Sequence, residues 1–118
     1  MWYISFGGGP KGVNNIWVYH DSGRPHARPA LLPTGKADPP LREVRGFAVA
    51  GRLLYVANAY ERDSQILLYA AGEDGAYRFK QVWASQQTTP ALVHPYDLTF
   101  DEQGNCYVSS QDTNVLTG

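Results

Sequence analysis

Three short segments of this chain follow one pattern: Trp2-Tyr3-Ile4-Ser5, Leu54-Tyr55-Val56-Ala57 and Cys106-Tyr107-Val108-Ser109. Their tyrosines stand at positions 3, 55 and 107, which are 52 residues apart in both steps (55 − 3 and 107 − 55). Aromatic and β-branched residues favour β-strands, so each segment is predicted to be a strand. Because the spacing is even, the segments indicate a structural unit that recurs along the chain.

The flanks of the three segments repeat as well. A second apolar run follows each tyrosine segment, at residues 15–19, 65–69 and 114–116. Acid-x-Gly turns then follow at 21–23 and 73–75, where glycine tolerates the positive φ of a hairpin turn. Inner strands are predicted at 44–49 and 93–98, each leading into the next tyrosine strand. Each unit therefore has four predicted strands, in the order inner, tyrosine, third and outer.

A strand-built repeat of roughly 40–50 residues is typical of the blades of a β-propeller. The strand runs at 53–56 and 66–69 are apolar at successive positions, which indicates sheets covered on both faces. The sequence thus predicts an all-β fold, a β-propeller fragment of about two four-stranded blades. Residues 1–45 are expected to form a partial first blade with a Pro-rich linker at 29–40, residues 46–94 a complete second blade, and residues 95–118 the start of a third.

Composition limits the classes of function. The 118 residues have a net charge of −1 and scattered basic residues, so nucleic acid is not an expected partner. The single cysteine, Cys106, can form neither an intrachain disulfide nor a Cys-based metal site, and it aligns with apolar positions, which indicates a buried thiol. No stretch approaches the ~20 apolar residues of a membrane-spanning helix. These features do not indicate the cellular compartment of the protein.

The segment at 94–110 reads His94-Pro95-Tyr96-Asp97-Leu98-Thr99-Phe100-Asp101-Glu102-Gln103-Gly104-Asn105-Cys106-Tyr107-Val108-Ser109-Ser110. It resembles an NHL-type repeat, with a proline, an apolar strand, an Asp-x-x-Gly turn and an apolar-Tyr-Val strand. Residues 45–69 form a weaker copy that lacks the proline. The resemblance implies a six-bladed β-propeller, and that superfamily contains binding scaffolds, lactonases, lyases and oxidoreductases, so it does not specify the activity.

About two blades do not close a propeller of six. Two alternatives follow for the partners of this chain. The simpler is that the remaining blades belong to a longer parent protein. The other is that several copies of the chain assemble into a ring, with their half-blades completing one another.

The candidate site residues lie in loops expected to share one face of the propeller. Arg45 and His94, 49 residues apart (94 − 45), are taken as equivalent positions at the entry to successive inner strands. Arg45, Asn58 and Asp112 are predicted to bind a ligand, and His94 and Asp97 are candidate acid/base catalysts. The alternative for Arg45 and His94 is that they cap strand ends or bind a backbone carbonyl. For Asp97, it is a structural hydrogen bond to a neighbouring blade.

The sequence can be compared with the calcium site of gluconolactonase-like propellers, to decide whether a metal ion is expected in this chain. The resemblance would imply a calcium site with an asparagine just before the glycine of an inner strand, but Arg45 precedes Gly46 and His94 precedes Pro95 here. Because calcium takes oxygen ligands, we predict no metal ion and no cofactor. The predicted function is a ligand- or protein-binding scaffold, and the alternative is part of a propeller hydrolase, lactonase or lyase.

Overall fold

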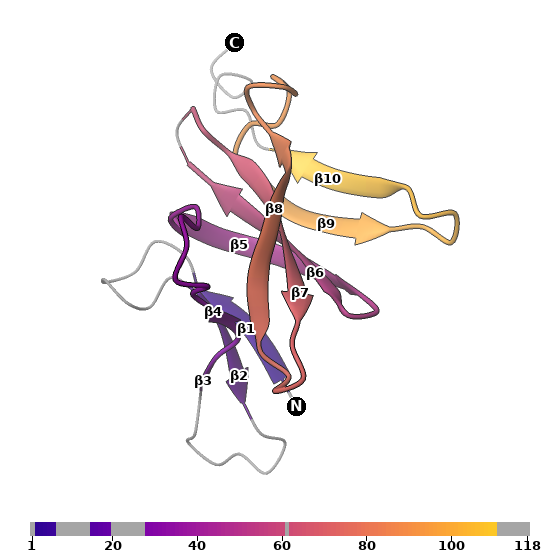
Figure 1. Ribbon diagram of the computed structural model, residues 1–118. Helices are drawn as coiled ribbons and strands as arrows, with labels where there is room; N and C mark the ends of the chain where they lie inside the picture. Colours follow the sequence, from indigo (N-terminus) through magenta and orange to yellow (C-terminus); the bar gives the residue numbers. More distant parts are fainter. Residues whose placement is uncertain (1, 7–14, 20–27, 61, 111–118) are drawn as a thin grey trace.

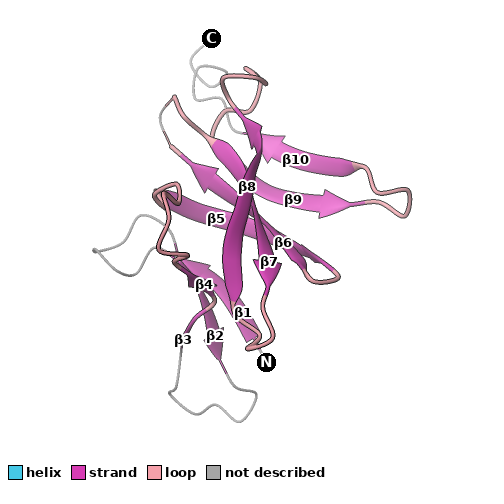
Figure 2. Ribbon diagram, viewed as in Figure 1, coloured by secondary structure: helices cyan, strands magenta, loops and turns pink. Residues whose placement is uncertain are grey.

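The structure is a computed structural model that describes residues 2–6, 15–19, 28–60 and 62–110. Within these ranges the chain forms ten β-strands and no helix (Figure 2), which confirms the all-β prediction. The same ranges accordingly contain no helix of the length and apolarity that a membrane crossing needs.

A twisted central sheet forms the middle of the molecule (Figure 1). Its four antiparallel strands follow one another in chain order: β5 (Glu43–Ala50), β6 (Leu53–Ala59), β7 (Gln65–Ala71) and β8 (Tyr77–Ser85). Gly51 and Gly75 take φ values of 62° and 80° in the turns between these strands, where L side chains are disfavoured. This is the four-stranded meander that the repeat predicts for one blade.

Two smaller sheets lie on opposite faces of the central sheet. The first contains β1 (Trp2–Phe6), β2 (Asn15–Tyr19) and β3 (Arg28–Pro29), and the other contains β9 (Pro95–Phe100) and β10 (Cys106–Ser110). We call them the first sheet and the third sheet. The three sheets therefore stack as successive blades do, and the architecture is that of a propeller-like β fragment.

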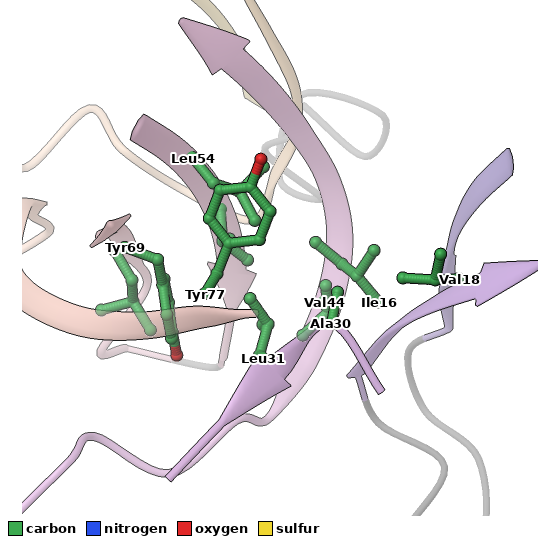
Figure 3. Close-up of a cluster of buried hydrophobic side chains, with 10 residues drawn as sticks. Ile16, Val18, Ala30, Leu31, Val44, Leu54, Tyr69 and Tyr77 are labelled. Carbon is green, nitrogen blue, oxygen red and sulfur yellow. The ribbon is translucent and has the colours of Figure 1, made fainter. Parts of the chain in front are cut away.

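The first interface lies between the first sheet and the central sheet (Figure 3). Ile16 and Val18 of β2 pack there against Val44, Leu54 and other buried side chains of the central sheet. Fully burying an aliphatic side chain stabilises a fold by roughly 1.5–3 kcal/mol. This cluster is thus a major source of stability for the stack.

The second interface lies between the central sheet and the third sheet. Ala57 and Ile66 are fully buried against Leu98, and Tyr55 packs against Phe100 with ring centroids 4.7 Å apart. Along β6, side chains alternate between the two interfaces, so Val56 contacts the first sheet and Ala57 the third. This double burial explains why the strand runs are apolar at successive positions.

The predicted Pro-rich linker is only partly a linker. Within it, β4 (Leu31–Leu32) pairs in parallel with the outer edge of β8, and Ala30 and Leu31 are buried in the first interface. The side-chain amide of Asn15 fixes this segment, since it accepts from Leu31 N–H and donates to Leu31 C=O, both at 3.1 Å. The prolines on either side made this strand hard to predict from the sequence. Its burial is driven by the apolar residues 30–32 between them.

The exposed β7–β8 turn provides a pH test. Asp74 accepts from Arg78 Nη2 at 2.9 Å and from Ala76 N–H at 3.1 Å, and these contacts, chiefly the one to Arg78, lower the pKa of Asp74 to about 2. Because the folded-state pKa is depressed, the contribution of Asp74 to stability is present above the unfolded pKa. It is lost as the pH falls through about 2. We expect an NMR titration of the Asp74 carboxyl to give that midpoint, and Arg78→Ala to raise it. A wild-type midpoint at 3.8, the ordinary pKa of an aspartate side chain, would contradict this ion pair.

Candidate functional site

Three connecting segments meet at one end of the central sheet: the approach to β5, the β6–β7 loop and the segment after β8 (Figure 1). They surround an open cleft of about 530 Å³, which we call the loop cleft. Its lining includes Pro40, Arg42, Tyr60, Gln65, Ser85 and Gln86. The strand order causes this convergence, since alternate connections of an antiparallel meander lie at the same end of the sheet.

Asn58 holds the approach to β5 against the end of β6. Its side chain is only 2% exposed. The amide oxygen accepts from Arg42 N–H at 2.8 Å, and the amide nitrogen donates to Pro40 C=O at 3.1 Å. The predicted ligand-binding residue Asn58 therefore lines the loop cleft with its polar atoms already engaged by the main chain. Its role as a direct ligand contact stays a prediction.

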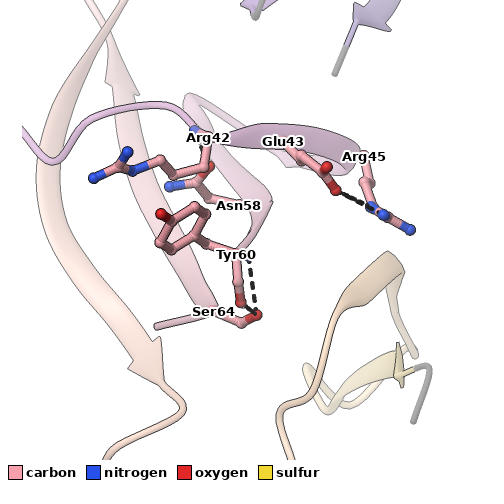
Figure 4. Close-up of polar contacts among 6 residues, drawn as sticks. All are labelled: Arg42, Glu43, Arg45, Asn58, Tyr60 and Ser64. Carbon is pink, nitrogen blue, oxygen red and sulfur yellow. Dashed lines mark hydrogen bonds and ion pairs between the residues drawn. The ribbon is translucent and has the colours of Figure 1, made fainter. Parts of the chain in front are cut away.

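Ser64 closes the β6–β7 loop in the same way. Its buried hydroxyl donates to Tyr60 C=O at 2.8 Å and accepts from Tyr60 N–H at 3.2 Å, as Figure 4 shows. The Ser64 N–H in turn donates to the Gln86 side-chain oxygen at 3.2 Å, which ties the loop to the end of β8. The walls of the cleft are thus fixed by hydrogen bonds between segments distant in sequence.

An arginine and a tyrosine stack at the mouth of the cleft. The guanidinium carbon of Arg42 lies 4.4 Å from the centre of the Tyr60 ring (Figure 4). A cation over an aromatic face at this distance contributes about 0.5–1 kcal/mol at an exposed site. The pair places a flat, partly apolar surface beside the amide and hydroxyl groups of Gln65, Ser85 and Gln86.

A second, smaller hollow of about 290 Å³ lies beside the inner strands β5 and β9, and we call it the inner hollow. Its lining consists of Ser5, Glu43, Val44, Arg45 and Tyr96. Arg45 donates to Glu43 from Nη2 at 2.6 Å and lies over the Tyr96 ring at 4.3 Å. Partial burial works to lower the pKa of Arg45, but the hydrogen bond and charge of Glu43, with a smaller contribution from Tyr96, outweigh it and raise the pKa. The positive charge of Arg45 is thus matched by a carboxylate beside it.

The strand registers correct the predicted equivalence of Arg45 and His94. In β5, Val44 pairs with Asn58 and Gly46 with Ala57, so Arg45 is an extra residue in a β-bulge. In β9 the extra residue is Tyr96, between Pro95 and Asp97. The true step is therefore 51 residues (96 − 45), and the prediction that matched Arg45 to His94 is wrong. A bulge re-aims its extra side chain, which is how Arg45 and Tyr96 come to stack.

The candidate catalysts lie close to this stack. Asp97 is exposed, and its carboxylate accepts from Leu98 N–H at 2.9 Å, while its own N–H donates to Ser109 Oγ at 3.1 Å. His94 is half-buried at a φ of 42°, and no hydrogen bond of its side chain to another described residue is found. Asp97 takes the strand position of Gly46, whereas the predicted step of 49 residues would match it to Ala48 (97 − 49). The structure thus gathers Arg45, Tyr96 and Asp97, and His94 lies two residues before Tyr96 in the chain.

Three other predicted features, Asp112, Cys106 and the absence of a metal site, contribute less to the description of the candidate site. Asp112 lies outside the described residues. Burial raises the pKa of the half-buried Cys106 thiol, which disfavours the reactive thiolate. Among the described residues no group of three His, Cys, Asp or Glu side chains could hold a metal ion.

Sequence reasoning missed Glu43, Tyr96, Arg42 and Gln86 as site residues. Tyr96 is the extra residue of a bulge, which a repeat with one unbroken spacing does not reveal. Comparison of the chain with protein-family models, with curated proteins and with solved structures finds no match. The case for a function therefore depends on the two hollows themselves.

Proposed function

We propose that this chain is part of a six-bladed, NHL-like β-propeller that acts as a binding scaffold, and that its partner binds in the loop cleft. The observation that carries the proposal is the cleft of about 530 Å³, whose walls are fixed by Asn58 and Ser64. A preformed hollow binds with a smaller loss of conformational entropy than a flexible loop. The half-buried amides and hydroxyls of Gln65, Ser85 and Gln86 beside the Tyr60 ring suit a neutral partner rich in hydrogen-bonding groups, such as an extended peptide.

The enzyme alternative receives less support. The lining of the loop cleft contains no histidine or cysteine among the described residues, and Asp63 is its carboxylate. In the inner hollow, Glu43 is paired with Arg45, which leaves it poorly placed to act as a base. A lactonase or lyase would need its acid and base from Asp97 and His94, and no contact between these two side chains is found.

Tyr60→Ala tests the cleft. The Tyr60 main chain, not its ring, contacts Ser64, so the loop keeps this support when the ring is removed. The probe is a set of N-acetylated, C-amidated tripeptides followed by NMR chemical-shift mapping. We expect shifts to gather at residues 39–42, 60–65 and 82–87, and Tyr60→Ala to weaken binding about tenfold, as loss of an aromatic anchor does.

The matched control is Tyr107→Ala, which removes an exposed tyrosine from the third sheet and is expected to leave tripeptide binding unchanged. Shifts centred on His94 and Asp97, together with hydrolysis of a sugar lactone that Asp97→Asn abolishes, would instead favour the enzyme alternative. Shifts without any clustering would contradict both.

A further inference from the structure

The hydrogen bonds that fix the loop cleft leave one side-chain amide with a donor group to spare. Asn58 and Ser64 are at most 2% exposed, and their side chains are engaged by the main chain. Gln86 differs from them. Its side-chain oxygen accepts from Ser64 N–H at 3.2 Å, and no hydrogen bond of its NH2 group to another described residue is found. Because the oxygen is held, the NH2 group is a preoriented donor in the cleft wall, which suits a hydrogen-bond acceptor.

The rest of the cleft combines apolar groups with balanced charge. Prolines 39–40, the Tyr60 ring and Val82 form its apolar lining, and Val82 is 40% exposed. Among the described residues, Arg42 and Asp63 are the charged side chains of this lining, and their charges cancel. An uncharged partner with apolar rings therefore complements the cleft better than a charged one.

Addition of the partner as a further strand is disfavoured. Val82 of β8 lines the cleft, so a bound peptide would lie beside that strand. Within the described part of the chain, β4 pairs with only the first two residues of β8, and residues 79–85 have no strand on their outer side. This edge is broken twice, because Lys80 and Trp83 are extra residues in β-bulges opposite β7. Bulges interrupt the ladder and twist an edge away from a pairing strand.

We propose that the partner of the loop cleft is a proline-rich segment in the polyproline II conformation. The inference rests on the proposed function of this cleft and specifies the partner. Polyproline II has no internal backbone hydrogen bonds, so its carbonyl groups are available to the Gln86 amide. Its rings would pack against Tyr60 and Val82, and it needs no strand beside it. Because proline already fixes φ, such a segment loses little conformational freedom on binding.

Two N-acetylated, C-amidated peptides, triproline and trialanine, test the proposal by NMR chemical-shift mapping. We expect triproline to shift the resonances of the cleft residues and to bind about tenfold more tightly, because each proline ring adds two methylene groups that can be buried. Gln86→Glu keeps an oxygen for Ser64 N–H but removes the donor, and should weaken triproline binding about tenfold. Gln81→Glu makes the same change at an exposed position of β8 outside the cleft lining, and this matched control should bind as the wild type does.

The possible results separate this inference from the proposed function. Equal binding of both peptides in the cleft would overturn the preference for proline and leave a peptide-binding cleft. Unchanged triproline binding by Gln86→Glu would overturn the role of the donor. If neither peptide shifted the cleft resonances, the inference and the proposed function would both fail. Tighter binding of blocked trivaline, with new hydrogen-exchange protection at residues 79–85, would show strand addition instead. Circular dichroism establishes that both variants are folded, and the comparison of peptides on wild-type protein depends on neither.

Discussion

Gly46→Ala is expected to lower the free energy of unfolding by about 3 kcal/mol, the upper range for overpacking a core. A Cβ at position 46 would overlap the carbonyl oxygen of Tyr96 and come within 2.9 Å of Cα and Oδ1 of Asp97. Two of these three atoms are main chain, so a side-chain rotation cannot relieve the contact. The inner strands β5 and β9 would have to separate, which would also pull Arg45 away from the Tyr96 ring. Urea unfolding measures the loss.

Two further variants show whether close packing is the cause. Gly51→Ala makes the same chemical change at a turn where a Cβ would meet no atom within 4 Å. It should cost only the backbone strain of a positive φ, about 1 kcal/mol. Adding Asp97→Ala to Gly46→Ala should recover little stability, because the Tyr96 carbonyl remains. Equal losses at Gly46 and Gly51, or full recovery in the double variant, would contradict the close approach of the two strands.

The fold could be predicted from the sequence because its signal is local and repeated. The even spacing of Tyr3, Tyr55 and Tyr107 predicts a strand that recurs along the chain. The apolar runs predict that the sheet is buried on both faces. The parallel strand at Leu31–Leu32 was harder to predict, because its partner β8 lies more than forty residues later in the chain. Pairings of that kind depend on the assembled core and leave no periodic pattern.

The site could be predicted only in outline. The convergence of loops follows from strand order, so Asn58 and its neighbourhood were accessible to sequence reasoning. The inner hollow was not, because the step between the two inner strands is 51 residues and not the predicted 49, so that Tyr96, and not His94, is equivalent to Arg45. A bulge adds one residue to one strand, and neither composition nor turn chemistry marks its position here.

Asn58→Leu is expected to lower the free energy of unfolding by about 1–3 kcal/mol, the loss of two hydrogen bonds. Leucine keeps the branched shape of the side chain, so the change removes hydrogen bonds without leaving a large cavity. Arg42 N–H and Pro40 C=O would each lose the partner that Asn58 provides. Arg42 and Pro40 are exposed residues whose main-chain groups can bond water instead, so each lost hydrogen bond costs about 0.5–1.5 kcal/mol. Urea unfolding gives the total, and amide hydrogen exchange at Arg42 reports on that one contact.

The repeat supplies a matched control for Asn58. Ser110 stands opposite Pro95 in the third sheet as Asn58 stands opposite Val44 in the central sheet, but it is exposed. Ser110→Ala should therefore change stability by less than about 0.5 kcal/mol. If Asn58→Leu cost no more than this, or if it left hydrogen exchange at Arg42 unchanged, Asn58 would not hold the approach to β5. The wall of the loop cleft would then be loose, and a scaffold that binds through a preformed cleft would lose its physical basis.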